Sequence, residues 1–251
     1  MFILYNFILI SLMFNESLNQ EQQRKIKAAI FDLDGTLLDT QRLYDEANQI
    51  LINQYGNGKP YDAELKLKIH GSSPLFGNKY MVDYFEIKLT LEEFMGKKNE
   101  YLKNKIPECK PMEGAEELTH ILKHKYGLKI AIATSSLKDS ADIKLTNHQK
   151  WIKSDFDLMI TGEDKRIVKG KPSPDIFLIA ATELGVKPEE CIIFEDAING
   201  VQAALNSGAS IVVGLPDSDT RNYMENLPYD KCKSKLYILN SFKDFDYSLI
   251  K

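Results

Sequence analysis

The sequence predicts an α/β fold, in which a parallel β-sheet with helices on its faces carries an inserted helical cap domain. Short, wholly apolar runs, typical of buried parallel strands, recur along the chain. Amphipathic helical segments lie between these runs. The stretch from residue 40 to 106 holds helical patterns but no strand-like run, which indicates an inserted helical unit.

The first expected strand is residues 28–31, Ala-Ala-Ile-Phe, and it runs directly into Asp32. Later apolar runs are expected to form the other strands, at residues 129–133, 158–160, 191–194, 211–213 and 236–239. Between them, two helices with one apolar face end at Gly127 and Gly208, where glycine suits a helix C-terminus. Strands that alternate with helices predict a parallel sheet with right-handed crossovers.

The insert contains helical patterns at residues 43–55 and 91–105, enough for a small helical bundle. Since it follows the first strand, we expect it to lie as a cap over the carboxyl edge of the sheet. The predicted organisation is a core made of residues 25–39 and 107–251, a helical cap of residues 40–106, and an N-terminal extension of residues 1–24.

Composition and charge exclude several classes of partner. The formal net charge is -4, which favours neither nucleic acid nor an anionic membrane surface. The segment Met1–Phe14 is almost wholly apolar, yet it lacks the basic start and the cleavage site of a secretory signal. It is also shorter than the roughly 20 residues that span a bilayer. We favour an extension outside the fold over a weak signal-anchor, and we expect no stable membrane association.

Cysteine usage indicates the compartment. Cys109, Cys191 and Cys232 are odd in number and widely spaced, and they form neither a disulfide framework nor a metal-binding motif. This pattern favours a reducing environment. We therefore expect a cytoplasmic protein, and we expect it to be a monomer.

Polar side chains gather where the expected strands end. Ligands of parallel α/β sheets bind beyond the carboxyl ends of the strands, so these residues are expected to share one site. They are two aspartates after the first strand, hydroxyls after the second, a lysine after the third and an acidic pair at the fourth: Asp32, Asp34, Thr134, Ser135, Lys171, Glu195 and Asp196. Carboxylates this close together repel and need a cation, and an all-oxygen site suits Mg²⁺.

This combination predicts chemistry on a phosphate group. A metal ion and Lys171 would neutralise the phosphate, while the Thr134 hydroxyl and the amides of the turn could hold its oxygens. One aspartate can then attack phosphorus while the other moves the proton of the leaving group.

The same residues resemble the motifs of the haloacid dehalogenase-like hydrolases. Residues 32–40, Asp-Leu-Asp-Gly-Thr-Leu-Leu-Asp-Thr, resemble the first motif of that family. Thr134 matches the second motif, Lys171 in Gly-Lys-Pro-Ser-Pro-Asp the third, and Phe-Glu-Asp at 194–196 the fourth. All four occur in the family's order, over residues 25–214. The resemblance implies a Rossmann-like core, a helical cap and Mg²⁺ as the cofactor.

The resemblance also implies a role for each matching residue. Asp32 would be the nucleophile and a metal ligand, and Asp34 would be the general acid/base and give its backbone carbonyl to the metal. The dehalogenases that name the family attack carbon without a metal and lack an acid at the position of Asp34. An aspartate there favours a phosphatase that hydrolyses a small phosphomonoester through an aspartyl-phosphate.

The remaining motif residues would bind phosphate and metal. Thr134, with Ser135 beside it, and Lys171 would bind the transferring phosphate, and Lys171 would also restrain the nucleophile. Asp196 would hold Mg²⁺, with Glu195 either a direct ligand or one step further from the ion.

The substrate is indicated less sharply. Stretches around the motifs resemble the eukaryotic pseudouridine-5'-phosphatase group, which makes pseudouridine 5'-phosphate the candidate, and they resemble glycerol-phosphate phosphatases closely as well. The segment His70, Gly71 and Ser72 falls where the family's helical-cap branch carries a substrate-contacting loop, although an ordinary helix–helix turn fits it equally. A sugar-phosphate phosphatase, a phosphosugar mutase and a non-catalytic phosphate-binding protein remain alternatives.

One histidine pair lies outside these motifs. His120 and His124 are four residues apart on an expected helix, as a metal-binding pair can be. No third ligand is evident nearby in the sequence, so we interpret them as part of a solvated helix face.

Overall fold

The computed structural model describes residues 26–250 apart from Gly71 and Cys232. The expected N-terminal extension, with its apolar segment Met1–Phe14, lies outside the described residues, as does Gly71 of the expected substrate loop. No helix in the described part of the chain combines the length and the apolarity that crossing a membrane requires.

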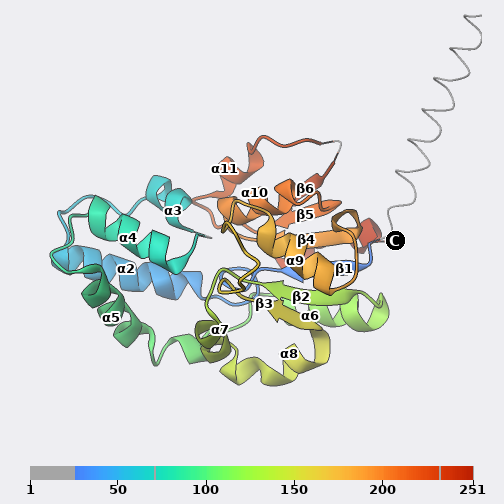
Figure 1. Ribbon diagram of the computed structural model, residues 1–251, viewed down its shortest axis with the longest axis horizontal. Helices are drawn as coiled ribbons and strands as arrows, with labels where there is room; N and C mark the ends of the chain where they lie inside the picture. Colours follow the sequence, from blue (N-terminus) through green and yellow to red (C-terminus); the bar gives the residue numbers. More distant parts are fainter. Residues whose placement is uncertain (1–25, 71, 232, 251) are drawn as a thin grey trace, which may run out of the picture.

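A six-stranded parallel sheet forms the centre of the described chain, which confirms the predicted α/β fold (Figure 1). In spatial order the strands are β3 (Leu158–Ile160), β2 (Lys129–Ala133), β1 (Ala28–Phe31), β4 (Cys191–Glu195), β5 (Ile211–Gly214) and β6 (Lys235–Ile238). The central strand β1 is fully buried because helices cover both faces of the sheet, as parallel sheets require.

Two apolar layers hold helices against the sheet, and alternate residues of β1 point into each. Ala29 and Phe31 belong to the layer under α6 (Ala115–His120), α7 (Lys138–Lys144) and α8 (Gln149–Asp155). Ala28 and Ile30 belong to the opposite layer, under α9 (Asp175–Glu183), α10 (Ile198–Asn206) and α11 (Arg221–Glu225). This division follows from the two-residue period of a strand.

Four helices form the insert between β1 and α6: α2 (Gln41–Tyr55), α3 (Ala63–Ile69), α4 (Pro74–Tyr84) and α5 (Leu91–Leu102). They pack around an apolar cluster of their own, which includes Phe85 and Phe94. Figure 1 shows the insert beside the sheet, and the chain passes into it directly from the turn after β1.

One helix differs from its expected form. Instead of one α-helix running to Gly127, α6 ends at His120 and continues as a π-helical turn, Ile121–Lys125, in which the Tyr126 amide donates to the Ile121 carbonyl at 3.2 Å. The apolar spacing of Leu118 and Leu122 fits both kinds of turn, so the sequence did not distinguish them.

Candidate active site

The carboxyl edge of the sheet gathers the predicted site residues. The register aligns Phe31 with Ile132 and Phe194, so the residues that follow these strands emerge side by side. Asp32 follows β1, Thr134 follows β2, and Glu195 ends β4. The strand ends therefore supply carboxylates and a hydroxyl at one edge, as the topology of parallel sheets dictates.

A buried lysine links two of these carboxylates. Lys171, from the loop before α9, places its Nζ 2.5 Å from Asp32 Oδ1 and 2.6 Å from Glu195 Oε1. The other Glu195 oxygen accepts a hydrogen bond from the Ala197 amide at 2.9 Å. Both oxygens of Glu195 thus have partners, and Lys171 is fixed beside Asp32.

Close packing confines the Glu195 carboxylate. A Cβ atom at Gly200, on the first turn of α10, would lie only 1.7 Å from Glu195 Oε1. Gly200 therefore leaves the space that this carboxylate occupies. The helix and the ion pair fit together only because position 200 has no side chain.

Electrostatics at the edge favour a bound cation. Burial, opposed by Lys171 and reinforced by Glu195 and Asp34, raises the pKa of Asp32 to about 7. Burial, together with the charges of Glu195 and Asp32, raises the pKa of Asp196 well above its usual value. Burial alone would lower the pKa of Lys171, but the neighbouring Asp32 and Glu195 carboxylates outweigh burial and raise it. These carboxylates outnumber the nearby positive charge, so the donor set fits a hard divalent cation such as Mg²⁺.

The turn after β1 brings Asp196 into this group. Gly35 has φ of +80°, and a Cβ there would lie 2.2 Å from Asp196 Oδ2. The Thr36 hydroxyl donates to Asp196 Oδ1 at 2.8 Å. Glycine is required at position 35 both by the backbone conformation and by the approach of the carboxylate.

Asp34 is held by a separate set of partners. The Thr40 hydroxyl donates to it at 2.6 Å, the Ser136 hydroxyl at 2.7 Å, and Lys144 Nζ lies 2.7 Å from the carboxylate. Burial alone would raise the pKa of Asp34, but the Lys144 charge and these hydrogen bonds outweigh it and lower that pKa. Asp34 is therefore ionised at neutral pH in this arrangement.

Sequence reasoning missed Lys144. It is almost fully buried, at 1% exposure, although it lies on a short helix beside Ala141 on the apolar face. A lysine on the buried face of an amphipathic helix is a signal for an internal ion pair. The sequence alone did not show that its partner would be Asp34.

Thr134 and Ser135, two of the three predicted phosphate-binding residues, line a cavity between the sheet edge and the insert. This cavity, of about 270 Å³, is lined by Asp32, Asp34, Thr134 and Ser135 from the core. Thr134 is buried, and its hydroxyl accepts a hydrogen bond from the Ser136 amide at 3.1 Å. Lys171 does not line the cavity itself, but it forms an ion pair with Asp32, which does.

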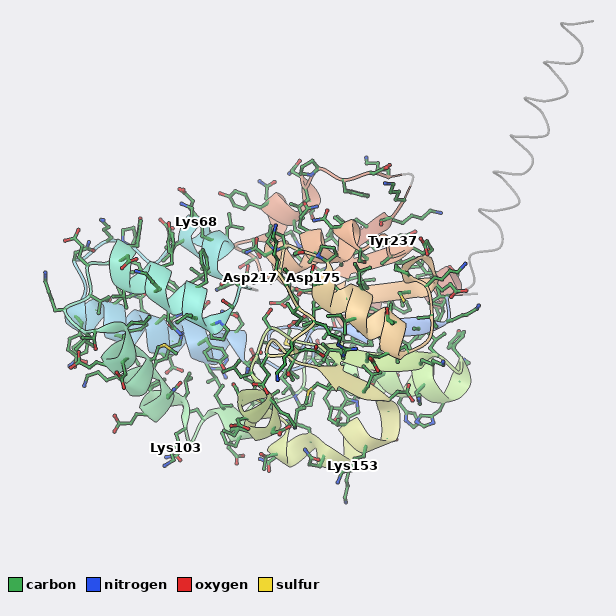
Figure 2. All side chains as sticks on the ribbon, viewed as in Figure 1. Lys68, Lys103, Lys153, Asp175, Asp217 and Tyr237 are labelled. Atoms are coloured by element: carbon green, nitrogen blue, oxygen red, sulfur yellow. The ribbon has the colours of Figure 1, made fainter. Side chains whose placement is uncertain are left out.

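The expected substrate loop also borders this cavity. His70 and Ser72 line it, and the Asn199 side-chain amide of α10 donates to the His70 carbonyl at 3.1 Å. A second cavity, of about 580 Å³, adjoins the first and shares His70 and Asp196 with it. Asp217 lies at this second cavity, between the insert and the core (Figure 2).

The insert side of the first cavity carries two polar groups that the described residues satisfy only in part. Lys98 of α5 makes no ion pair with a described carboxylate; its Nζ donates to Asn78 Oδ1 at 3.1 Å, and burial lowers its pKa to about 8. Asn48 of α2 donates to the Tyr61 oxygen at 3.1 Å, while its own Oδ1 is buried without a partner among the described residues. Tyr61 gives its proton to Asp45 at 2.7 Å, which fixes the orientation of the Asn48 amide.

The family follows from comparison with known proteins. Residues 29–213 match the family described as haloacid dehalogenase-like hydrolase. The match covers more than half of the chain, so this protein belongs to the haloacid dehalogenase-like hydrolases. With phosphatases among its relatives, it is a phosphoric monoester hydrolase acting on phosphorylated small molecules.

Individual relatives cover most of the chain. The Drosophila melanogaster "Probable pseudouridine-5'-phosphatase" is 36% identical over 88% of this chain and 92% of that protein. The Arabidopsis thaliana mitochondrial "(DL)-glycerol-3-phosphatase 1" is 33% identical over 88% of this chain and 72% of that protein. A solved structure, β-phosphoglucomutase from Clostridium difficile, is 26% identical and superposes with a TM-score of 0.69, covering 90% of this chain and 95% of that one.

Proposed function

We propose that this protein is a Mg²⁺-dependent phosphatase that hydrolyses a small phosphomonoester through an aspartyl-phosphate on Asp32. The observation that carries the proposal is the buried ion pair between Lys171 and Asp32 at 2.5 Å. It holds one carboxylate in a single orientation, beside a positive charge that can neutralise an incoming phosphate. Fixed orientation and matched charge are what a covalent phosphoryl transfer needs.

The reaction has two steps. An oxygen of Asp32 forms a bond to phosphorus while the bond from phosphorus to the leaving oxygen breaks, and Asp34 gives a proton to that oxygen. Water then attacks the phosphorus, passes a proton to Asp34, and releases Asp32 and inorganic phosphate. Because Asp34 is ionised beside Lys144, we expect it to take up its proton only when substrate changes this contact.

The other groups at the sheet edge would assist these steps. Thr134 and Ser135 line the cavity beside Asp32 and would hold the phosphate oxygens. Asp32, Asp196 and the Asp34 backbone carbonyl would hold Mg²⁺, which when bound neutralises charge on the transferring group. We assign Glu195 the role of holding Lys171, because both of its oxygens already accept hydrogen bonds.

The insert would act as the cap that selects the leaving group. Asn48 offers a buried acceptor that has no partner among the described residues, and Lys98 offers a cationic donor on the same cavity wall. A uracil ring presents both N–H donors and carbonyl acceptors. Together with the relative named as a pseudouridine-5'-phosphatase, this makes pseudouridine 5'-phosphate our candidate substrate.

The test is phosphate release from a panel of phosphomonoesters, with Mg²⁺ and with chelator. The panel includes pseudouridine 5'-phosphate, uridine 5'-phosphate, glycerol phosphate and a sugar phosphate. Uridine 5'-phosphate is the matched control because it lacks one ring N–H donor of pseudouridine. We expect chelator-sensitive release with a preference for pseudouridine 5'-phosphate of at least about tenfold. Equal rates across the panel would refute the substrate assignment but not the phosphatase.

The mechanism is tested by Asp32→Asn. We expect a loss of phosphate release of at least about 10³-fold without loss of the fold, because an amide is a poor nucleophile. Circular dichroism checks the fold. An Asp32→Asn protein that is folded and still active would refute the proposed mechanism. Conversion of a sugar phosphate into its isomer without free phosphate would identify a mutase, the activity of the neighbour from Clostridium difficile.

A further inference from the structure

A second group of ligating side chains lies at the opposite end of the sheet from Asp32. It consists of His120 and His124, on α6 and its π-helical turn, and Asp155, the last residue of α8. These elements lead into the amino ends of β2 and β3, whereas the catalytic residues follow the carboxyl ends. Asp155 is the third ligand that the sequence around the two histidines did not reveal.

The three candidate ligand atoms lie close together. His124 Nε2 lies 3.0 Å from Asp155 Oδ1, and His120 Nδ1 lies 3.5 Å from the same oxygen. All three ligand atoms lie within 4.8 Å of one another. In a tetrahedral Zn²⁺ site with bonds of about 2.0–2.2 Å, neighbouring ligand atoms are about 3.4 Å apart. The spacing of the group therefore needs only small side-chain adjustments to hold an ion.

The two imidazoles meet across the junction between α6 and the π-helical turn. Its hydrogen bonds span five residues rather than four, so the turn is wider than an α-helical one. Residues four apart lie on the same face of a helix. The rings of His120 and His124 lie 4.4 Å apart between centroids.

Asp155 is oriented by a buried chain of hydrogen bonds. Its side chain is 2% exposed, and its Oδ2 accepts from the Thr119 hydroxyl at 2.9 Å. The Thr119 oxygen in turn accepts from the indole N–H of Trp151 at 2.7 Å. This leaves Oδ1 facing the imidazoles. A ligand carboxylate held by such outer partners is typical of metal sites built into a fold.

We propose that His120, His124 and Asp155 bind a Zn²⁺ ion, with water at the fourth position. Two imidazole nitrogens and one carboxylate oxygen are a donor set for Zn²⁺ rather than for Mg²⁺. Both histidines are exposed, at 65% and 45% of their side chains, so ion and water can reach the site. The ion would join α6 to α8 and stabilise this layer of the core. The proposal is independent of the phosphatase assignment.

The nearest alternative is a set of ordinary polar contacts. Without an ion, His124 Nε2 shares a hydrogen bond with Asp155 and approaches the Ser154 hydroxyl at 3.4 Å. These contacts would keep the side chains close but would confer no preference for one metal over another. A metal titration separates the two interpretations directly.

The experiment is calorimetric titration of the full chain with Zn²⁺ in millimolar Mg²⁺, which keeps the catalytic carboxylates occupied. We expect one Zn²⁺ site whose affinity falls more than about tenfold in His120→Ala and in His124→Ala. Glu117→Gln, an exposed acidic residue on the same helix, is the matched control and should bind as the parent does. Co²⁺ should give the visible absorption bands of a tetrahedral complex in the parent and in Glu117→Gln, but not in the two histidine variants.

Both histidines are exposed, so their replacement should leave the fold intact, and a thermal melt without metal checks this. Added Zn²⁺ should raise the melting temperature of the parent more than that of either histidine variant. Equal Zn²⁺ affinity in parent and histidine variants, or no binding by the parent, would overturn the proposal.

Discussion

The sheet edge and the insert present two different walls to the same cavity. At the sheet edge every carboxylate has a partner: Asp32 and Glu195 share Lys171, Asp34 has Lys144, and Asp196 has Thr36. On the insert wall, Lys98 lacks a counter-charge and Asn48 lacks a donor among the described residues. The difference teaches that contacts within the protein already position the reactive groups of the core. The polar groups of the insert still have hydrogen-bonding capacity that a substrate can use.

If the residues of the sheet edge carry out the reaction, Asp34→Asn should cause the largest loss of activity after Asp32→Asn. We expect a loss in kcat of about 10²–10⁴-fold, because the proton for the leaving oxygen loses its carrier. Steady-state rates with the preferred phosphomonoester measure this. Asp39→Asn, a partly exposed acid in the same segment that pairs with Arg42, is the control and should lose little. A loss confined to KM would place Asp34 in binding instead.

Lys144→Met should have the next largest effect. It removes the charge that lowers the pKa of Asp34, so that pKa should rise and the pH–rate profile should shift to higher pH. We expect kcat to fall about 10²-fold and the protein to lose about 1–3 kcal/mol of stability at neutral pH, since the Asp34 carboxylate loses its counter-charge and keeps only the Thr40 and Ser136 hydroxyls. Lys138→Met, exposed on the same helix, should change neither. An unshifted profile in a folded variant would contradict the ion pair's role.

On the insert wall, Lys98→Met should act on binding alone. We expect KM to rise about tenfold while kcat changes little, because one charged hydrogen bond to the leaving group is lost. Lys97→Met, on the exposed side of the same helix, is the control. A fall in kcat with unchanged KM would show that Lys98 acts in the chemical step rather than in substrate binding.

The smallest effect concerns stability without metal. Burial raises the pKa of Asp32 from its ordinary value of 3.8 to about 7, so folding favours its protonated form. The ionised Asp32 carboxylate therefore destabilises the folded protein. This destabilisation grows as pH rises from about 4 to 7 and reaches its maximum above pH 7. In chelator, Asp32→Asn should raise the melting temperature by a few degrees at pH 8 and by less at pH 5. Thermal melts at both pH values measure this; a gain that grows toward acid pH would contradict the sign.

The sheet and its edge could be predicted because both depend on local patterns. Each of these strands is an apolar run with a polar site residue at its carboxyl end. Asp32, for example, directly follows Phe31, the last residue of β1. Lys144 and Lys98 could not be placed in this way, since each meets its partners only when separate elements pack together. The same reason hid Asp155, which comes from a different helix than His120 and His124. The wider π-helical turn had no distinguishing spacing in the sequence.

The glycine on the first turn of α10 has a practical consequence. Since even one carbon at position 200 would collide with the Glu195 carboxylate, Gly200→Ala would displace that carboxylate and with it Lys171. Every charged group would remain in the polypeptide, yet the nucleophile would lose its fixed orientation. An inactive enzyme that still carries its full set of ionisable groups is a useful reagent for capturing intact substrate from a mixture of metabolites.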